Sequence, residues 1–481
     1  MALWGSAVDS ARATCSPSGR ARCISILAAA LVAASAGSAL AVVRYVDDSA
    51  PPGGNGQSWG TAYNNLRTAL TASAAGDEIR VAQGLYKPGT LRTDTFTLKD
   101  GVSVRGGFAG LGTLNPNARD PLAFPTILSG DLLGNDGPNF ANMTDNAYVV
   151  VTAPSTVSAS TVLDGFTITG GNADGAFGTQ DRGGGLAIAG SPAILNCTIT
   201  RNSASGGGGV NVASTGNPSL RHCRFIANRA TGASAGFSSG GGLNILGNAE
   251  VSACFFAGNS AAGNGGGLAG ATGATGTKIS NGVFTGNSAA QGGGVHVGNS
   301  SLINCTIAGN SASIAGGGLS AAPATTPSIT NTILCGNTVG FSPQQVSGSA
   351  VITFSCVEGG ASGTGNIAGD PMFVSPLGPD NLPGTGDEDL RLRAGPGAYS
   401  SCIDAGNRIP AEAMLTVDAA GGARFVDIPA VPDTGAGTGV AVDIGAYEAV
   451  VAQCNVDVNG DGFVDPDDLA DFIAAYFGGC P

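Results

Sequence analysis

The stretch that decides the fold runs from Asn196 to Val212 and reads NCTITRNSASGGGGVNV. A short apolar strand precedes Asn-Ser-Ala, and a run of glycines then opens a second apolar strand. Related copies begin at His222, Ala253, Asn281 and Asn304, with a fading one at Asn331. The asparagine after the first strand recurs every 23 to 31 residues, as Asn202, Asn228, Asn259, Asn287, Asn310 and Asn337. A repeat of this length, built from strands and turn residues, predicts a solenoid of stacked coils.

The strand chemistry selects one kind of solenoid. Each copy offers strands of about four to six residues, broken by Gly, Asn and Ser, which are too short for helices. Residues two apart, such as Cys197 and Ile199, share one face of a strand, so stacked coils align them in an apolar column. The asparagine suits a corner because it tolerates the left-handed conformation and its amide can bond to the next asparagine in the stack. The glycine runs mark another turn, where side chains would collide between coils. We therefore expect an all-β, right-handed parallel β-helix.

The cysteines of the repeats occupy one equivalent position. We expect them to point inward as a buried ladder of small apolar residues, formed by Cys197, Cys223, Cys254 and Cys305. In the copy between the last two, Gly282 takes this position, so the four cysteines could not all pair. A further bridge among Cys335, Cys356 and Cys402 stays open at this point.

The first 41 residues have the parts of a secretory signal. A basic region with Arg12, Arg20 and Arg22 precedes an apolar stretch, residues 24–34, and a small-x-small cleavage site, residues 39–41. The apolar stretch is shorter than the ~20 residues that a membrane-spanning helix needs. We therefore expect an exported protein, secreted or associated with the cell surface, and not an integral membrane protein.

Charge bears on the class of partner. The chain has 80 glycines, only 11% charged residues and a formal net charge of −13. Removal of residues 1–41 takes away three arginines and one aspartate, which makes the net charge −15. A chain this acidic is a poor match for the phosphate backbone, so we expect no nucleic-acid partner.

The stretches that flank the repeats carry a resemblance to a known family. They are VSVRGGFAG from Val102, TILSGD from Thr126 and VLDGFTITGGNADG from Val162, then SCVEGG, GDPMFV, LRLRAGPGAYSSCIDAGN and VDIGAYE between Ser355 and Glu448. With these the chain resembles secreted right-handed β-helix proteins with pectate-lyase-like folds and polymorphic outer-membrane-protein-like repeats. The resemblance spans nearly the whole mature chain and implies fold and location, because that family carries no single known activity.

The chain divides at composition changes. We expect a signal peptide at 1–41, an N-terminal cap and first coils at 42–150, and β-helix repeats at 151–375. The C-terminal end of the β-helix follows at 376–449, and a separate module at 450–481. In the cap, Leu66, Ala69 and Leu70 place an apolar stripe on a short helix, and residues 78–82 start the first coil.

The last module contains a calcium loop, DVNGDGFVDPDD, from Asp457 to Asp468. Alternating oxygen donors suit calcium, which takes six to eight hard ligands and needs a chain that wraps around it. The predicted ligands are Asp457, Asn459, Asp461, the Phe463 carbonyl, Asp465 and Asp468, with Gly462 at the sharp turn. The flanking Cys454 and Cys480 could pair in an exported protein.

Aspartate at the twelfth loop position, with no clear helix before the loop, resembles a dockerin repeat. Dockerins that bind cohesins carry two such loops, and this chain has one. The departure argues against a cohesin-like partner and leaves calcium binding with a role in surface attachment.

Catalysis in a β-helix needs converging carboxylates, with an Arg or Lys base in a lyase. Between Gly183 and Val357 the only acidic residue is Glu250, so those coils cannot supply a carboxylate pair. The first coils hold one acidic cluster beside a base, formed by the candidates Asp164, Asp174, Asp181 and Arg182. We interpret these more readily as solvated loop charges.

The sequence therefore favours an exported, non-catalytic β-helix protein whose long face contacts polysaccharide or a cell-surface component. Its C-terminal module would bind calcium and attach the protein. The alternative is a calcium-dependent polysaccharide-degrading enzyme, either a pectate-lyase-like lyase or a glycoside hydrolase.

Overall fold

The computed structural model describes residues 41–178, 180–232, 240–395, 399–409 and 416–450. The expected signal segment, apart from its last residue, lies outside these residues. So does the expected calcium loop, 457–468, together with Cys454 and Cys480.

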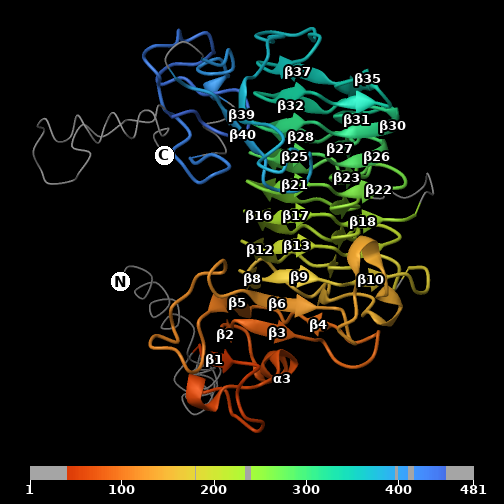
Figure 1. The fold of residues 1–481 in the computed structure, drawn as a ribbon, viewed down its shortest axis with the longest axis vertical. Helices are drawn as coiled ribbons and strands as arrows, with labels where there is room; N and C mark the ends of the chain where they lie inside the picture. The colour runs from red at the N-terminus through yellow and green to blue at the C-terminus, as the bar shows by residue number, and fades with distance from the viewer. Residues whose placement is uncertain (1–40, 179, 233–239, 396–398, 410–415, 451–481) are drawn as a thin grey trace, which may run out of the picture. The chain divides into compact units, whose positions relative to one another are not determined.

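The described chain is a parallel β-helix, which confirms the expected architecture. A complete coil passes in turn through an eleven-stranded, a ten-stranded, an eight-stranded and a nine-stranded sheet. Within each sheet, a strand pairs with the equivalent strand of the next coil. One coil, for example, runs from β12 (Ala193–Leu195) through β13 (Thr198–Thr200) and β14 (Ser203–Ala204) to β15 (Val210–Val212). Figure 1 shows the coils stacked from β1 to β37, wound in the right-handed sense that parallel connections favour.

The eleven-stranded sheet begins with β1. We expected residues 78–82 to start the first coil, but these residues form β2, and β1 precedes β2 in the sheet. It contains β1 (Val43–Val46), β2 (Glu78–Ala82), β5 (Ser103–Phe108), β8 (Val162–Asp164), β12, β16 (Ser219–Arg221), β20 (Glu250–Ser252), β24 (Lys278–Ser280), β28 (Ser301–Ile303), β32 (Ser328–Thr330) and β37 (Val351–Thr353). The ten-stranded sheet contains β3 (Gly84–Tyr86), β6 (Thr126–Ser129), β9 (Thr167–Thr169), β13, β17 (Arg224–Ile226), β21 (Phe255–Ala257), β25 (Val283–Thr285), β29 (Thr306–Ala308), β33 (Ile333–Cys335) and β38 (Cys356–Val357).

The two remaining long sheets close each coil. The eight-stranded sheet contains β10 (Asn172–Ala173), β14, β18 (Arg229–Ala230), β22 (Ser260–Ala261), β26 (Ser288–Gln291), β30 (Ser311–Ala315), β34 (Thr338–Val339) and the antiparallel β35 (Ser342–Pro343). The nine-stranded sheet contains β4 (Phe96–Thr97), β7 (Val151–Ala153), β11 (Leu186–Ile188), β15, β19 (Leu243–Ile245), β23 (Leu268–Gly270), β27 (Val295–Val297), β31 (Leu319–Ala321) and β36 (Val346–Ser347).

The repeated asparagines form the expected ladder along the inside of one corner. Asn259 is representative: its Nδ2 donates to Asn287 Oδ1 at 2.9 Å, and its Oδ1 accepts from Asn228 Nδ2 at 2.9 Å. At its upper end the ladder meets the amide oxygen of Gln345, which accepts from Asn337 Nδ2 at 2.7 Å. Every rung is buried, so the ladder satisfies backbone and amide groups that water cannot reach.

The left-handed backbone at this corner belongs to a different residue from the one we expected. It falls on the residue before the ladder asparagine, with φ of 53° at Arg201, 52° at Ala227 and 59° at Gly258. The asparagines are needed for their amides, while the preceding residue makes the turn.

The glycine runs behave as expected. A Cβ on Gly241 would lie 2.4 Å from the Gly266 carbonyl oxygen and 2.5 Å from that of Ser260, closer than real Cβ atoms approach backbone. Coils can stack at this turn only where no side chain intervenes.

The core is one continuous apolar column. Phe225, Phe256 and Phe284 stack face to face in successive coils, with ring centroids 4.4 Å and 4.6 Å apart. The expected inward cysteine ladder is confirmed, because Cys197, Cys223, Cys254 and Cys305 are buried free thiols. Cys335, Cys356 and Cys402 are also free thiols in the structure.

Short helices and a C-terminal segment complete the described fold. The cap helix α3 (Leu66–Ala72) buries Leu66, Ala69 and Leu70, as expected. The 3-10 helices are η1 (Trp59–Thr61), η2 (Pro138–Phe140) and η3 (Met143–Asp145). In the part of the chain that the structure describes, no helix is long and apolar enough to cross a membrane.

The described residues between 369 and 449, termed the C-terminal segment, pack on the outer face of the ten-stranded sheet (Figure 1). The segment contains the antiparallel pair β39 (Phe373–Ser375) and β40 (Asp389–Leu392). It is pinned by hydrogen bonds such as Asn304 Nδ2 to the Asp443 carbonyl at 3.1 Å and Ala446 N–H to Thr306 Oγ1 at 3.0 Å. The outward residues beneath it are apolar, among them Phe255, Val283 and Ile333.

Candidate functional site

The predicted acidic candidates do not converge. Asp164 ends β8 on the eleven-stranded sheet and is 4% exposed. Its Oδ2 lies 3.0 Å from Arg119 Nη2, and its Oδ1 accepts from Asn196 Nδ2 at 2.8 Å. This carboxylate is engaged in holding neighbouring coils together.

The other three candidates lie in the insertion after β10. Asp174 Oδ1 is 2.5 Å from Arg92 Nη2, and the buried Asp181 accepts from the Gly178 N–H at 2.9 Å. Arg182 Nε lies 3.8 Å from Asp181 Oδ2. Asp181 and Arg182 are brought together as chain neighbours, whereas Asp164 lies in a strand of the eleven-stranded sheet, outside the insertion.

A better-formed site lies beside this insertion. Two pockets of about 380 and 270 Å³ adjoin one another, and both are lined by Phe140 and Met143. We call this combined recess the Phe140 groove. Its floor comes from the ten-stranded and eight-stranded sheets, including Thr169, Ser203 and Ala204, and its wall is the loop of residues 130–146. In Figure 1 this loop lies beside β10 and β18.

The wall is built around two polar anchors. The Asp131 carboxylate accepts from the backbone N–H groups of Gly134, Asn135 and Asp136, at 2.6, 3.1 and 3.2 Å. The buried Asn146 donates from Nδ2 to Asp136 Oδ2 at 2.9 Å and to the Gly170 carbonyl at 2.7 Å. These bonds fix the loop in one conformation against the coils.

The crest of the loop is strained. Asn139, Phe140 and Asn142 have φ of 55°, 63° and 65°, in the left-handed region. Such values are unusual for a bulky residue like phenylalanine and persist only where surrounding contacts impose them. The Arg229 guanidinium carbon lies 4.2 Å from the centroid of the Phe140 ring and supplies one such contact. Such contacts hold the half-buried Phe140 ring between the two pockets despite the strain.

Charged groups of both signs line the first pocket. Burial raises the pKa of Asp136, with further repulsion from Asp131 and Asp145. Arg201 comes from the corner after β13, and no carboxylate of the described residues forms an ion pair with it. The Phe140 groove thus combines an aromatic ring, an unpaired guanidinium, carboxylates and amides.

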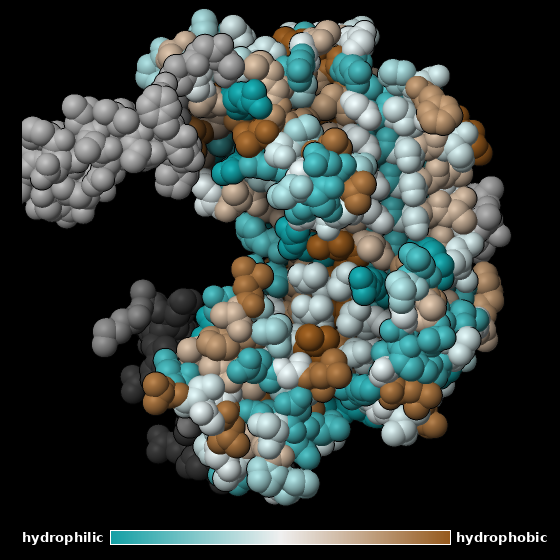
Figure 2. Space-filling model, viewed as in Figure 1, coloured by the Kyte–Doolittle hydropathy of each residue, from teal (hydrophilic) through white to brown (hydrophobic). Residues whose placement is uncertain are grey.

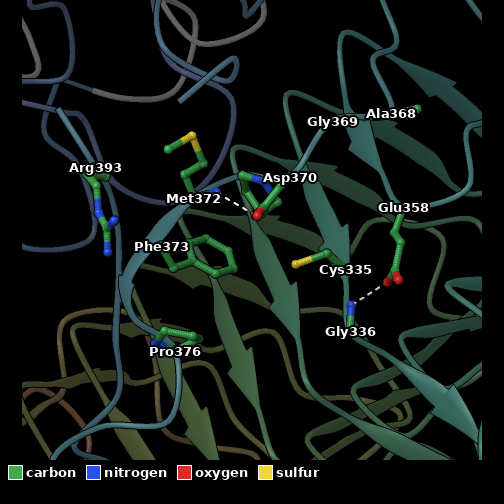
Figure 3. Close-up of a pocket in the computed structure, with 11 residues that line it drawn as sticks. Cys335, Gly336, Glu358, Ala368, Gly369, Asp370, Met372, Phe373, Pro376 and Arg393 are labelled. Carbon is green, nitrogen blue, oxygen red and sulfur yellow. Dashed lines mark hydrogen bonds between the residues drawn. The ribbon is translucent and has the colours of Figure 1, made fainter. Parts of the chain in front are cut away.

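A second recess of about 530 Å³ lies where the C-terminal segment meets the last coils (Figure 3). Both of its carboxylates cap backbone: Glu358 Oε2 accepts from Gly336 N–H at 2.6 Å, and Asp370 Oδ1 from Met372 N–H at 2.8 Å. Burial raises the pKa of Cys335 far above its ordinary value, so its thiol is not a ready nucleophile. Both carboxylates of this recess are therefore occupied by the backbone that they cap.

Sequence reasoning did not single out the residues of the groove. The available signal was the turn-rich stretch GDLLGNDGPNF, residues 130–140, which interrupts the spacing of the coils. Its partners Arg201 and Arg229 sit beside ladder asparagines two and three coils later, and only the stacking of coils shows that they meet the loop.

Comparisons with known proteins found distant structural likenesses, two of which follow. No family model matches the chain, and no curated protein sequence matches it. The crystal structure of pectate lyase Pel9A aligns with a TM-score of 0.43 and 15% identity, covering 86% of this chain and 97% of that one. The structure of XylC in complex with xylose aligns with a TM-score of 0.32 and 9% identity, covering 69% of this chain and 87% of that one. At these values neither neighbour assigns a residue or an activity to this chain, and the parallel β-helix rests on its own sheet topology.

Proposed function

We propose that this chain is an exported, non-catalytic β-helix protein that binds polysaccharide in the Phe140 groove. The supporting observation is the fixed aromatic ring between two pockets that are lined by hydroxyl, amide, carboxylate and guanidinium groups. Sugar rings present apolar C–H faces and a rim of hydroxyls, so a concave site with an aromatic surface and a few polar groups matches them. The surrounding face mixes hydrophilic and hydrophobic residues, as Figure 2 shows, which suits contact with a hydrated polymer.

The non-catalytic assignment rests on how the carboxylates are used. The long central coils hold a single acidic residue, Glu250, and both of its oxygens lie 3.0 Å from Arg221 Nη2 on the open surface. In the groove, Asp131 is occupied by three backbone N–H groups. Converging, uncommitted carboxylates of the kind that hydrolases use are therefore lacking among these residues.

One observation favours the enzyme alternative. Asp136, whose pKa is raised by burial, lines the same pocket as the unpaired Arg201. A carboxyl group beside a guanidinium group is a pairing that polysaccharide lyases and hydrolases can use. The two functions are separated by looking for new chain ends.

We expect no depolymerisation when the mature protein is incubated with pectate, alginate or xylan in the presence of calcium. The measurement is the appearance of unsaturated or reducing ends. If the parent protein formed such ends and either Asp136→Asn or Asp181→Ala abolished them, the enzyme alternative would replace our proposal.

The C-terminal module is proposed to bind one calcium ion through the six loop residues named above and to attach the protein at the cell surface. Because four carboxylates of the loop would repel one another when empty, metal binding and local folding should be coupled. Calorimetry on the 450–481 peptide, oxidised at Cys454 and Cys480, should show calcium heat that Asp461→Ala removes. A silent titration at millimolar calcium would leave the loop as an acidic turn.

A further inference from the structure

Three carboxylates converge in the C-terminal segment, outside the predicted calcium loop. They belong to Asp404, Asp427 and Asp433, and one oxygen of each lies within 4.8 Å of the others. Among the residues that the structure describes, this is the one group of three or more potential metal ligands that meets so closely.

Asp404 is held in place by backbone contacts. It is fully buried and takes the left-handed conformation, with φ of 53°. Its N–H donates to Asp443 Oδ1 at 2.8 Å, and its carbonyl accepts from the N–H groups of Thr434 and Gly435, both at 3.0 Å. The loop of residues 427–435 is thereby folded against Asp404, which brings the carboxylates of Asp427 and Asp433 to it.

The Asp404 carboxylate is only partly satisfied by the protein. Its Oδ2 accepts from Ile428 N–H at 3.3 Å, whereas its Oδ1 has no hydrogen-bond partner in the described protein. A buried, unpartnered carboxylate oxygen is costly and calls for an explanation, such as a bound ion or water.

The electrostatics of the group agree with this. No arginine or lysine of the described residues forms an ion pair with any of the three carboxylates. Burial, followed by repulsion from Asp433 and Asp427, raises the pKa of Asp404 to about 6. At neutral pH the group therefore gathers negative charges that repel one another at short range.

We propose that Asp404, Asp427 and Asp433 form a structural calcium site that fastens the loop of residues 427–435 to the body of the C-terminal segment. Carboxylate oxygens are hard ligands, which favour calcium over zinc. With calcium–oxygen distances of about 2.3–2.6 Å, ligand oxygens around one ion lie up to about 5 Å apart, which accommodates the observed spacing. Asp427 and Asp433 are exposed, so water can complete the coordination.

The site has a structural consequence for the rest of the fold. Asp443, which binds the Asp404 N–H, also accepts from Asn304 through its carbonyl. Calcium at Asp404 should therefore stabilise the contact between the C-terminal segment and the ten-stranded sheet.

The test uses the full mature chain carrying Asp461→Ala, so that the predicted C-terminal loop contributes no calcium heat. Calorimetry should show one calcium ion bound per chain, and calcium should raise the melting temperature at pH 7.5. Asp427→Asn and Asp433→Asn should each weaken binding at least tenfold. Both side chains are exposed, so these variants should fold, which circular dichroism checks. Asp380→Asn, an exposed aspartate of the same segment, should bind calcium as the parent does.

Several results would overturn the proposal. They are an absence of calcium heat in the Asp461→Ala chain at millimolar metal, equal binding by the Asp427→Asn and Asp433→Asn variants, or binding of magnesium in preference to calcium. Because the parent already lacks the predicted loop ligand, failure of that loop would leave this test unaffected.

Discussion

Replacing Asn259 by alanine should lower the free energy of unfolding by about 3–5 kcal/mol, because one rung of the buried ladder would leave several polar groups without partners. Asn259 Nδ2 donates to the Phe225 carbonyl at 2.8 Å and to Asn287 Oδ1 at 2.9 Å. Its Oδ1 accepts from both the backbone N–H and the Nδ2 of Asn228, at 3.0 and 2.9 Å. None of these groups can turn to water, since the residue is fully buried.

The matched control is Asn217→Ala, an exposed asparagine at a neighbouring turn. It should change stability by no more than about 0.5 kcal/mol, as is usual for surface substitutions. Denaturant midpoints of the two variants and the parent give the comparison. A similar small change in both would mean that the ladder contributes alignment without much stability.

The second large effect is expected from Arg424→Met in the C-terminal segment. Arg424 is fully buried; its Nη2 donates to the carbonyls of Asp443 and Gly445 at 2.9 and 2.6 Å, and its Nε lies 3.5 Å from Glu448 Oε2. Removing one partner of a buried ion pair costs about 3–5 kcal/mol, because the remaining charge has no compensation. The exposed pair of Arg391 and Asp389 provides the control, since Arg391→Met should cost at most about 1 kcal/mol.

The Arg424→Met effect should also depend on pH. Burial raises the pKa of Glu448 and of Asp443 in the folded protein, despite Arg424. A carboxyl with a raised folded pKa binds more protons in the folded than in the unfolded state, so stability falls as pH rises above the ordinary carboxyl range. Without the guanidinium this fall should be steeper, and the loss should be larger at pH 8 than at pH 5. Thermal midpoints measured across that range test it; equal losses at both pH values would contradict this account of Arg424.

The repeats made most of the fold predictable. Asparagine and glycine recur at fixed places in successive repeats, and cysteine in four of them, and each has one physical reason to be there. What could not be predicted depends on contacts between distant parts of the chain. The packing of the C-terminal segment on the ten-stranded sheet is an example. In that sheet, Thr198-Ile199-Thr200 is polar on its outer face and apolar on its inner face, whereas Phe255-Phe256-Ala257 is apolar on both faces. That loss of alternation is the signal of a strand buried on both sides, although it does not say by what.

The candidate sites were less accessible to sequence reasoning. The predicted acidic candidates share a stretch of chain, but Asp164 ends β8 in the eleven-stranded sheet, whereas Asp174 and Asp181 lie in the insertion after β10. Conversely, the loop of residues 130–146 meets Arg201 and Arg229 only because coils separated in sequence lie next to one another. Asp404 likewise meets Asp427 and Asp433 only after the chain folds back on itself. Motif spacing reports local geometry, and these sites are assembled by tertiary packing.

The most direct test of the central claim is calorimetric titration of the mature protein with the oligosaccharide that a glycan array selects. We predict that Arg201→Ala and Phe140→Ala each weaken binding by at least tenfold, a loss of about 1.4 kcal/mol. Arg221→Ala, on the exposed face of the eleven-stranded sheet, should bind as the parent does. Unchanged affinity in both groove variants, or no glycan bound by the parent, would contradict the claim that the Phe140 groove is a polysaccharide-binding site.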